Sequence, residues 1–212
     1  MSTMTDEHLV TDLERLREVY PTAPSAVSLA KETQVLTPAY AELVRAAPFV
    51  VIATAGPHGL DQSPRGDAPG FAEVRDERTI VIPDRRGNNR LDTLTNLVRD
   101  PRIGLLFLVP GLGEELRVRG TAVISTDPDE LASHTVQGRA PASLIVVTVE
   151  RVFFQCARAV RRARLWEADH HVPAGCLPTA GQMTLEARGF ETVEQAQAYD
   201  AELPARQEAT LY

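Results

Sequence analysis

The feature that most restricts the fold is the segment 115–125, ELRVRGTAVIS, in which apolar and polar side chains alternate. A period of two residues predicts a β-strand with one face buried. Just before it, residues 102–110, RIGLLFLVP, form a continuous apolar run that is short enough for a buried strand. The intervening GLGEEL begins like a dinucleotide fingerprint, but it lacks the third glycine and leads into a strand. We therefore interpret it as a hairpin turn.

The rest of the chain adds strands and short helices. Three further strands are predicted over residues 49–54, 78–83 and 143–155. We read AGPHGLDQSP, after the first of these, as turn formers. A helix is predicted over 88–98, with Asn88 or Asn89 as N-cap, and another over DPDELASH, with Asp127 as N-cap. A third is predicted over TPAYAELVRAAP, with Thr37 as N-cap and Pro38 in its first turn. A fourth, small helix is predicted over TVEQAQAY.

This order of elements predicts the fold class. Five or six strands interrupted by short helices, rather than alternating with them, indicate a mainly β protein, an antiparallel barrel with peripheral helices. We expect one domain over 1–212: a helical N-terminal extension (1–47), a barrel core (48–166) and a C-terminal extension (167–212). A content of 43% hydrophobic and 24% charged residues agrees with a globular protein.

The net charge of -7 excludes a general nucleic-acid binder, so any basic cluster acts locally. The N-terminal segment is acidic and has no apolar core, and apolar runs are far shorter than the roughly 20 residues that span a membrane. We expect a cytoplasmic protein with no membrane partner.

Cys156 and Cys176 are not in metal-ligand spacing and would normally stay reduced in the cytoplasm, although a single disulfide is possible. The five histidines do not have ligand spacing either, and we expect no metal site.

The segment 84–90, DRRGNNR, stands where a strand gives way to a helix and concentrates Arg85, Arg86 and Arg90 around one glycine. Arginine forks, asparagine amides and a helix N-terminus are the donors that hold a phosphate. The alternative is an ordinary polar turn with an asparagine cap. Spacing alone does not separate the two readings.

Two further basic segments bear on this choice. DQSPRGD (61–67) places Ser63, Arg65 and Asp67 in a turn after the first strand, where Arg65 would reach the same anion if the strands 49–54 and 78–83 are neighbours. An exposed Arg–Asp pair is the alternative, and it would contribute little to stability.

The segment FFQCARAVRRARLW (153–166) holds four arginines before Trp166, the one tryptophan of the chain. Its indole would either stack on a planar ligand or anchor the core.

Taken together, SPRGD, DRRGNNR and FFQCARA…LW resemble the pyridoxamine 5′-phosphate oxidase-like, FMN-binding split-barrel family, in a branch of uncharacterised bacterial members. The resemblance covers roughly residues 45–166. It implies a six-stranded antiparallel split barrel that forms a homodimer, with FMN in each of two clefts between the subunits. It further implies a set of cofactor-binding residues: Arg65, Arg85, Asn88, Asn89 and Arg90 around the phosphate, with Ser63 nearby, the backbone of Ile82, Pro83 and Asp84 along the flavin ring, and Arg158 and Trp166 of the segment after the last barrel strand, from the same or the partner subunit.

The sequence departs from the vitamin B6 oxidase itself. The C-terminal Arg…Arg-x-His pattern of those enzymes is absent from YDAELPARQEATLY, and Lys31 is the one lysine of the chain. We therefore doubt vitamin B6 oxidation, and expect a flavoprotein that transfers hydride or electrons between a reduced nicotinamide, or another small donor, and an unknown small acceptor. The catalytic residue is unknown. The alternative is a non-catalytic carrier or binder of flavin, haem or deazaflavin; a third reading is an arginine-rich dimer interface without a ligand.

Overall fold

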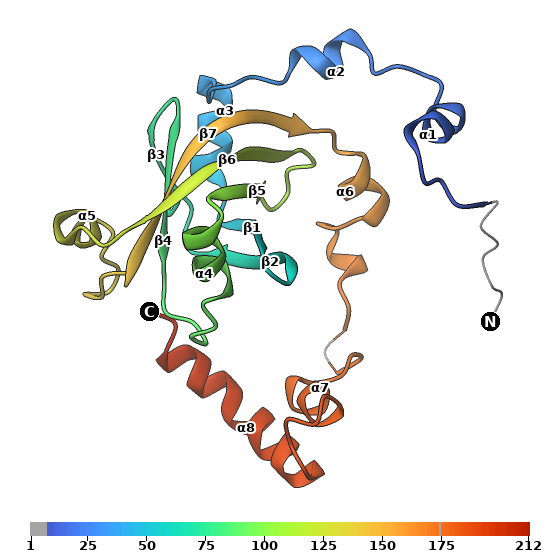
Figure 1. Ribbon diagram of the computed structural model, residues 1–212. Coiled ribbons are helices and arrows are strands. Elements are labelled where there is room, and N and C mark those ends of the chain that lie inside the picture. The colour runs from blue at the N-terminus through green and yellow to red at the C-terminus, as the bar shows by residue number, and fades with distance from the viewer. Residues whose placement is uncertain (1–7, 174) are drawn as a thin grey trace. The chain divides into compact units, whose positions relative to one another are not determined.

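The computed structural model describes residues 8–173 and 175–212, which divide into two units (Figure 1). Residues 1–32 form the first unit and residues 33–212 the second, and each is described by itself. The described part of the first unit contains helices α1 (Leu13–Val19) and α2 (Ala26–Ala30). The second contains helices α3 (Pro38–Ala46), α4 (Asp92–Arg99), α5 (Pro128–Ser133), α6 (Arg158–Ala163), α7 (Ala180–Glu186) and α8 (Val193–Ala209).

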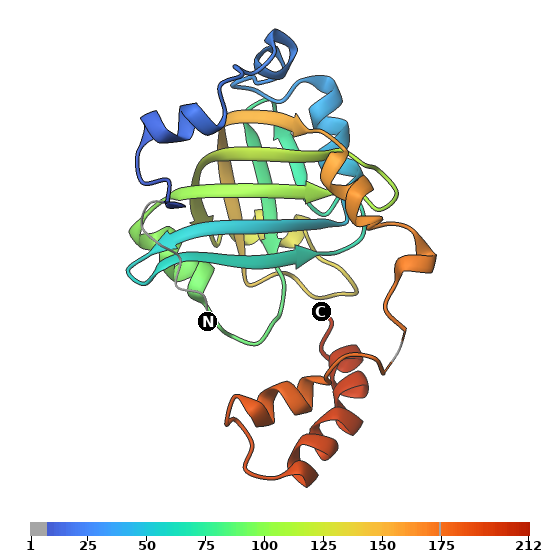
Figure 2. The ribbon, with the colours of Figure 1, turned by 90° about the vertical axis from the view of Figure 1, so that its right-hand side faces the viewer.

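The second unit is built on a single antiparallel sheet in the order β2-β1-β5-β6-β7-β4-β3. Its strands are β1 (Phe49–Gly56), β2 (Gly59–Gly66), β3 (Glu73–Asp76), β4 (Thr79–Asp84), β5 (Arg102–Leu108), β6 (Glu115–Ser125) and β7 (Ser143–Gln155). Figure 2 shows the sheet curling, so that β4 and β3 cross behind the strands at its other end. The mainly β antiparallel fold is confirmed, but the predicted count of six strands is wrong, because the sheet has seven.

The two strands missing from the sequence interpretation are the edge strands. β2 was read as a turn because it holds glycine, aspartate and Pro64, yet it pairs with β1 along its whole length, from Gly56↔Gly59 to Phe49↔Gly66. Proline is tolerated in an edge strand, where its missing N–H faces no neighbour. β3 is four residues long and has the charged sequence EVRD. Short, charged edge strands resist pairing with other chains, and they leave a weak hydrophobic pattern.

The predicted helix over 88–98 begins later than expected. α4 starts at Asp92, its N-cap is Leu91, and no side chain caps it. Asn88 instead accepts a hydrogen bond from the Arg90 amide at 3.0 Å, and Asn89 has a φ of 57°. These local bonds hold residues 88–90 in a turn, so the asparagine cap was a wrong prediction.

Other boundaries follow the sequence. Thr37 caps α3 with Pro38 at its start, and Asp127 caps α5 by accepting from the amides of Asp129 and Glu130. The predicted hairpin turn after residue 110 is confirmed, since β6 begins at Glu115 and pairs with β5. α8 is much longer than the small helix predicted from TVEQAQAY.

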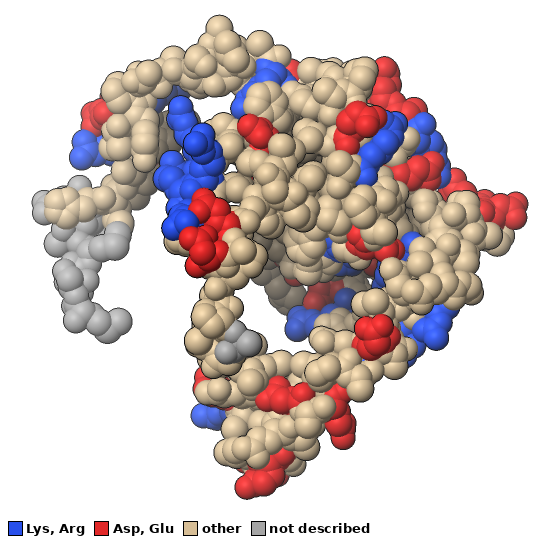
Figure 3. Space-filling view, turned by 180° about the vertical axis from the view of Figure 1, so that it is seen from behind, with Lys and Arg blue, Asp and Glu red and all other residues tan. Residues whose placement is uncertain are grey.

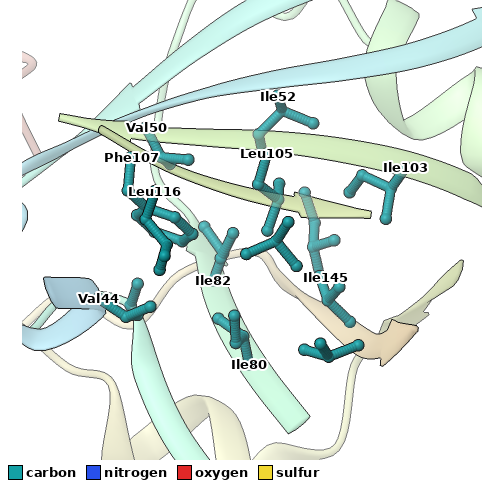
Figure 4. Close-up of a cluster of buried hydrophobic side chains, with 14 of the residues drawn as sticks. Val44, Val50, Ile52, Ile80, Ile82, Ile103, Leu105, Phe107, Leu116 and Ile145 are labelled. Atoms are coloured by element: carbon teal, nitrogen blue, oxygen red, sulfur yellow. The ribbon is translucent and has the colours of Figure 1, made fainter. Parts of the chain in front are cut away.

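The core lies inside the curled sheet, where side chains from five strands and α3 converge (Figure 4). Val44 of α3 points into the same cluster as Ile80 and Ile82 of β4 and Phe107 of β5. All four are at most 1% exposed, so this cluster removes most of its apolar surface from water, which is the main favourable contribution to folding. Among the described residues, no helix is both long and apolar enough to cross a bilayer. The cytoplasmic location stays a prediction.

At Gly120, β6 and β7 approach so closely that there is no space for a side chain. The register shifts at Arg119/Gly120, and a Cβ built on Gly120 would lie 1.9 Å from the carbonyl oxygen of Thr148. We expect Gly120→Ala to lower the free energy of unfolding by about 1–3 kcal/mol, measured by urea denaturation, because the β7 backbone must move. Gly104→Ala in β5 is the control, since its Cβ would meet ordinary contact distances. Equal stabilities of the two variants would contradict this account.

Candidate functional site

A cavity of about 1010 Å³ lies where β2 and β4 end and β7 begins. β4 and β7 pair antiparallel as far as Asp84↔Ser143. The chain leaving β4 therefore runs beside the chain entering β7, and the turn after β2 closes a further side. The walls are Ser63–Ala68 of β2 and the turn after it, Asp84–Leu91 and Leu94 of the β4–α4 segment, Arg139–Ser143 before β7, and Leu211 with Tyr212.

Positive charge predominates in this cavity. Five arginines line it, namely Arg65, Arg85, Arg86, Arg90 and Arg139, against two aspartates, Asp67 and Asp84. The chain as a whole carries a net charge of -7, and acidic side chains are spread over much of the face shown in Figure 3. The cavity therefore concentrates positive charge locally in an acidic protein, which favours an anionic ligand.

Arg65 is fixed by neighbours from two strands. Its Nε donates to Asp84 Oδ1 at 3.2 Å, and its Nη1 donates to Ser63 Oγ at 2.6 Å and to the carbonyl of Pro64 at 2.9 Å. The side chains of Arg65 and Asp84 are 18% and 15% exposed. The strands 49–54 and 78–83 are not neighbours in the sheet, so that expectation is wrong, but the curl of the sheet brings the end of β2 to the end of β4, where this ion pair joins them.

Arg85 is held in the same way by Asp67. Its Nε donates to Asp67 Oδ2 at 2.9 Å, and its Nη1 donates to the carbonyl of His134 at 2.6 Å. Asp67 is 4% exposed, and its other oxygen accepts from the Tyr212 hydroxyl at 2.7 Å. A charge buried this deeply needs partners, and Asp67 has three: Arg85, Tyr212 and the backbone amide of Ala68.

These contacts shift two pKa values. Burial by itself raises the pKa of Asp67, but the hydrogen bonds from Tyr212, the Ala68 amide and Arg85 together outweigh it and leave this pKa below its ordinary value. The pKa of Tyr212 is raised, first by its hydrogen bond to Asp67 and then by burial and by the negative charge of that carboxylate. At neutral pH the ionised carboxylate therefore accepts from a protonated phenol.

Seven of the residues expected at the cofactor line this one cavity: Ser63, Arg65, Asp84, Arg85, Asn88, Asn89 and Arg90. Ile82 and Pro83 are buried in β4 and do not line it. Arg158 is exposed at the start of α6, and Trp166 is half-buried and donates from Nε1 to the carbonyl of Leu112 at 2.7 Å. Neither lies in the cavity of its own chain, and their role toward a ligand of a second subunit stays a prediction.

Several cavity residues were absent from the expected set, among them Asp67, Arg86, Arg139 and Tyr212. Arg86 belongs to the DRRGNNR segment, and its basic and polar neighbours there are the sequence signal for it. Arg139 precedes β7, and the Asp84↔Ser143 register brings it beside the residues after β4. That register would have identified Arg139, but strand pairing is not readable from one sequence. For Tyr212, which follows α8, we find no sequence signal.

A family model described as pyridoxamine 5′-phosphate oxidase matches residues 36–156, which is more than half of the chain. The chain therefore belongs to the pyridoxamine 5′-phosphate oxidase family, which includes FMN-binding proteins and oxidoreductases. The predicted resemblance is confirmed. The matched region contains the β2, β4 and β7 segments of the cavity but ends before α7 and α8. No curated protein matches the chain significantly.

Several solved structures are similar to part of the chain. HupZ of Group A Streptococcus is 21% identical, with a TM-score of 0.47 over 57% of this chain and 94% of that chain. General stress protein 26 of Bacillus anthracis is 12% identical, with a TM-score of 0.37 over 53% and 88%. An FAD-binding protein of Mesorhizobium loti is 14% identical, with a TM-score of 0.39 over 58% and 96%. The family assignment stands on the family model alone.

Asp67 provides a test by pH. Because its pKa is lowered on folding, its contribution to stability is present above the unfolded pKa of about 3.9 and is lost as the pH falls through the lower folded value. We expect the difference in unfolding free energy between the wild type and Asp67→Asn to be largest near neutral pH and to shrink below about pH 4. Urea denaturation across this pH range measures it. A difference that grows on acidification would contradict the assignment.

Proposed function

We propose that the protein binds FMN in this cavity and acts as an oxidoreductase that moves hydride or electrons between a reduced nicotinamide, or another small donor, and a small-molecule acceptor. The observation that carries the proposal is the set of five arginines facing two aspartates in one cavity of an acidic chain. Family membership supports the choice of a flavin over other anions.

The donors of the cavity fit a phosphate. A guanidinium has five N–H groups, and Arg85 uses two of them on Asp67 and His134 within the described structure. The carboxylate thus fixes the direction of Arg85 while further N–H groups stay available to a ligand. Arg86 and Arg90 are exposed, and the Arg90–Asp92 pair is a surface contact that contributes little. Together with Asn88 and Asn89, these side chains form the proposed phosphate site.

The bound flavin would supply the redox chemistry. The chain would contribute binding and orientation: Arg65 and Arg85, held by Asp84 and Asp67, fix the anionic end of the ligand in one place. The volume of about 1010 Å³ is at the upper end of small-molecule sites, which leaves room for a substrate beside a cofactor. We name no catalytic acid or base.

We also propose that the protein is a homodimer with FMN at the subunit interface. A hollow of about 410 Å³ on the outer face of β1, β5 and β6 is lined by apolar Val51 and Leu106 and by Glu115, Arg117 and Arg119, among others. Within the described part of the chain, Glu115 Oε2 is buried and accepts no hydrogen bond. A buried oxygen of this kind is costly unless a donor reaches it, and a second subunit on this face would provide one.

The cofactor is tested by an absorption spectrum of the purified protein with and without added FMN. We expect flavin bands in the wild type. Replacing two arginines, Arg65→Ala and Arg90→Ala together, should weaken FMN binding by about 100-fold, since each charged contact is worth about 1.5 kcal/mol or more. Arg45→Ala on α3 is the control, because Arg45 is exposed, pairs with Glu42 and does not line the cavity.

A colourless wild type that takes up no added FMN would refute the proposed cofactor. A flavin-loaded protein whose spectrum is bleached rapidly by reduced nicotinamide supports the oxidoreductase. Slow reduction by every small donor tried would favour a flavin carrier instead.

The dimer is tested by a charge on the proposed interface. We expect Leu106→Glu to convert the dimer to a monomer in sedimentation velocity, because a carboxylate would be desolvated in an apolar contact. Leu60→Glu at the tip of the β1–β2 hairpin, where the side chain is 85% exposed, should leave the dimer intact. A wild type that sediments as a monomer with full FMN content would refute the shared site.

A further inference from the structure

The segment after α8 reaches into the arginine-lined cavity. Leu211 and Tyr212 are part of its wall, and Figures 1 and 2 both show the C label beside the end of β4 and the loop that follows it. The Tyr212 hydroxyl donates to Asp67 Oδ1 at 2.7 Å, and its ring centroid lies 5.9 Å from the guanidinium carbon of Arg85. Arg139 Nη1 donates to the main-chain oxygen of Tyr212.

The two helices before Tyr212 form a hairpin with its own contacts. Asp200 of α8 accepts from the Thr179 hydroxyl at 2.5 Å and from the Gly181 amide at 2.7 Å. The rings of Phe190 and Tyr199 lie 5.3 Å apart. A Cβ on Gly181 would lie 2.2 Å from a carbonyl oxygen of α8, so the helices approach closely. The hairpin is therefore a packed element in its own right.

Tyr212 joins this hairpin to the barrel. In the described part of the chain, the hydrogen bonds that connect residues 175–212 with the barrel all involve Tyr212, one through its hydroxyl to Asp67 and one through its main-chain oxygen from Arg139. Both partners line the cavity. The residues that attach the hairpin, Asp67 and Arg139, are thus also residues of the candidate ligand site.

The contact leaves the phosphate donors in place. Tyr212 donates to one oxygen of Asp67 while Arg85 donates to the other, so the phenol takes no N–H group from Arg85. With Tyr212 present the cavity still has about 1010 Å³, enough for a nucleotide-sized ligand. Tyr212 is therefore arranged as a wall of the site and does not fill it.

We propose that Tyr212 latches the α7–α8 hairpin onto the cavity, and that opening of this latch controls how fast the anionic ligand enters and leaves. The inference rests on the proposed FMN site for its ligand, whereas the latch itself rests on the contacts of Tyr212. Loss of the hydroxyl removes a hydrogen bond to a carboxylate, which should raise the open population by about tenfold. If the ligand enters and leaves only while the hairpin is open, the rate constants of association and dissociation both rise with the open population.

The test compares Tyr212→Phe, a variant lacking Leu211 and Tyr212, and Tyr199→Phe. The last removes a phenol hydroxyl from the same hairpin without touching the cavity. Stopped-flow quenching of FMN fluorescence gives both rates. In Tyr212→Phe we expect both rates to rise about tenfold, with the dissociation constant changed less than about threefold, and in Tyr199→Phe we expect neither rate to change. In the variant lacking Leu211 and Tyr212 both rates should rise at least as much, and the loss of two wall residues should also weaken binding. Unchanged rates, or a rise in dissociation alone with weaker binding, would overturn the latch.

A second measurement needs no ligand. Hydrogen exchange of the α7 and α8 amides should be faster in Tyr212→Phe than in Tyr199→Phe, because the hairpin has lost its attachment. If the wild type binds no FMN but exchange depends on Tyr212, the proposed cofactor fails and the latch stands. If FMN binds and neither exchange nor ligand rates respond to Tyr212, the latch fails and the cofactor stands.

Discussion

The pairing of β4 with β7 is the constraint on which the candidate site depends. Its register runs from Thr79↔Thr148 to Asp84↔Ser143, so the polar segments that follow β4 and precede β7 must lie side by side. The apolar side chains that hold this register, Ile82 and Ile145 among them, are completely buried. A one-residue slip would move each of these side chains to the opposite face of the sheet and out of this cluster, so the core strongly disfavours any other pairing. The position of the arginines is thus set by the buried side chains of two strands, of which only the end residues Asp84 and Ser143 line the cavity.

The two aspartates explain how five guanidiniums are kept in one cavity. Without counter-charges the arginines would repel each other and fold away toward water, where their long side chains keep more freedom. Asp84 and Asp67 hold Arg65 and Arg85 in fixed directions and offset part of the charge, at the expense of burying two carboxylates. The remaining arginines keep the cavity positive. Acidic residues within the proposed anion site are therefore compatible with binding, because they fix the directions of Arg65 and Arg85.

The sequence predicted what depends on local pattern. The five apolar strands, the Thr37 and Asp127 caps and the segments bearing Arg65 and Arg85 could all be read from residue type and spacing. The edge strands could not, because β2 is rich in turn formers and gains its structure from pairing with β1. The start of α4 was misplaced because Asn88 and Asn89 serve the turn and not the helix. Arg139 and Tyr212 escaped prediction for a different reason. They join the site through strand register and through a helical hairpin, and both are long-range properties that one sequence does not display.

The carboxylate of Asp67 connects the arginine-lined cavity with the α7–α8 hairpin. Its carboxylate accepts from Arg85 with one oxygen and from Tyr212 with the other, so it is at once the support of a ligand-facing cation and the anchor of the α7–α8 hairpin. Tyr212 donates to one oxygen of the carboxylate and leaves the further N–H groups of Arg85 unused, so a closed hairpin and a bound phosphate would not compete for the same donors. A carboxylate that is 4% exposed has little access to water, which favours the closed hairpin whether or not a ligand is bound. Closure would therefore govern access to the cavity far more than affinity for the ligand.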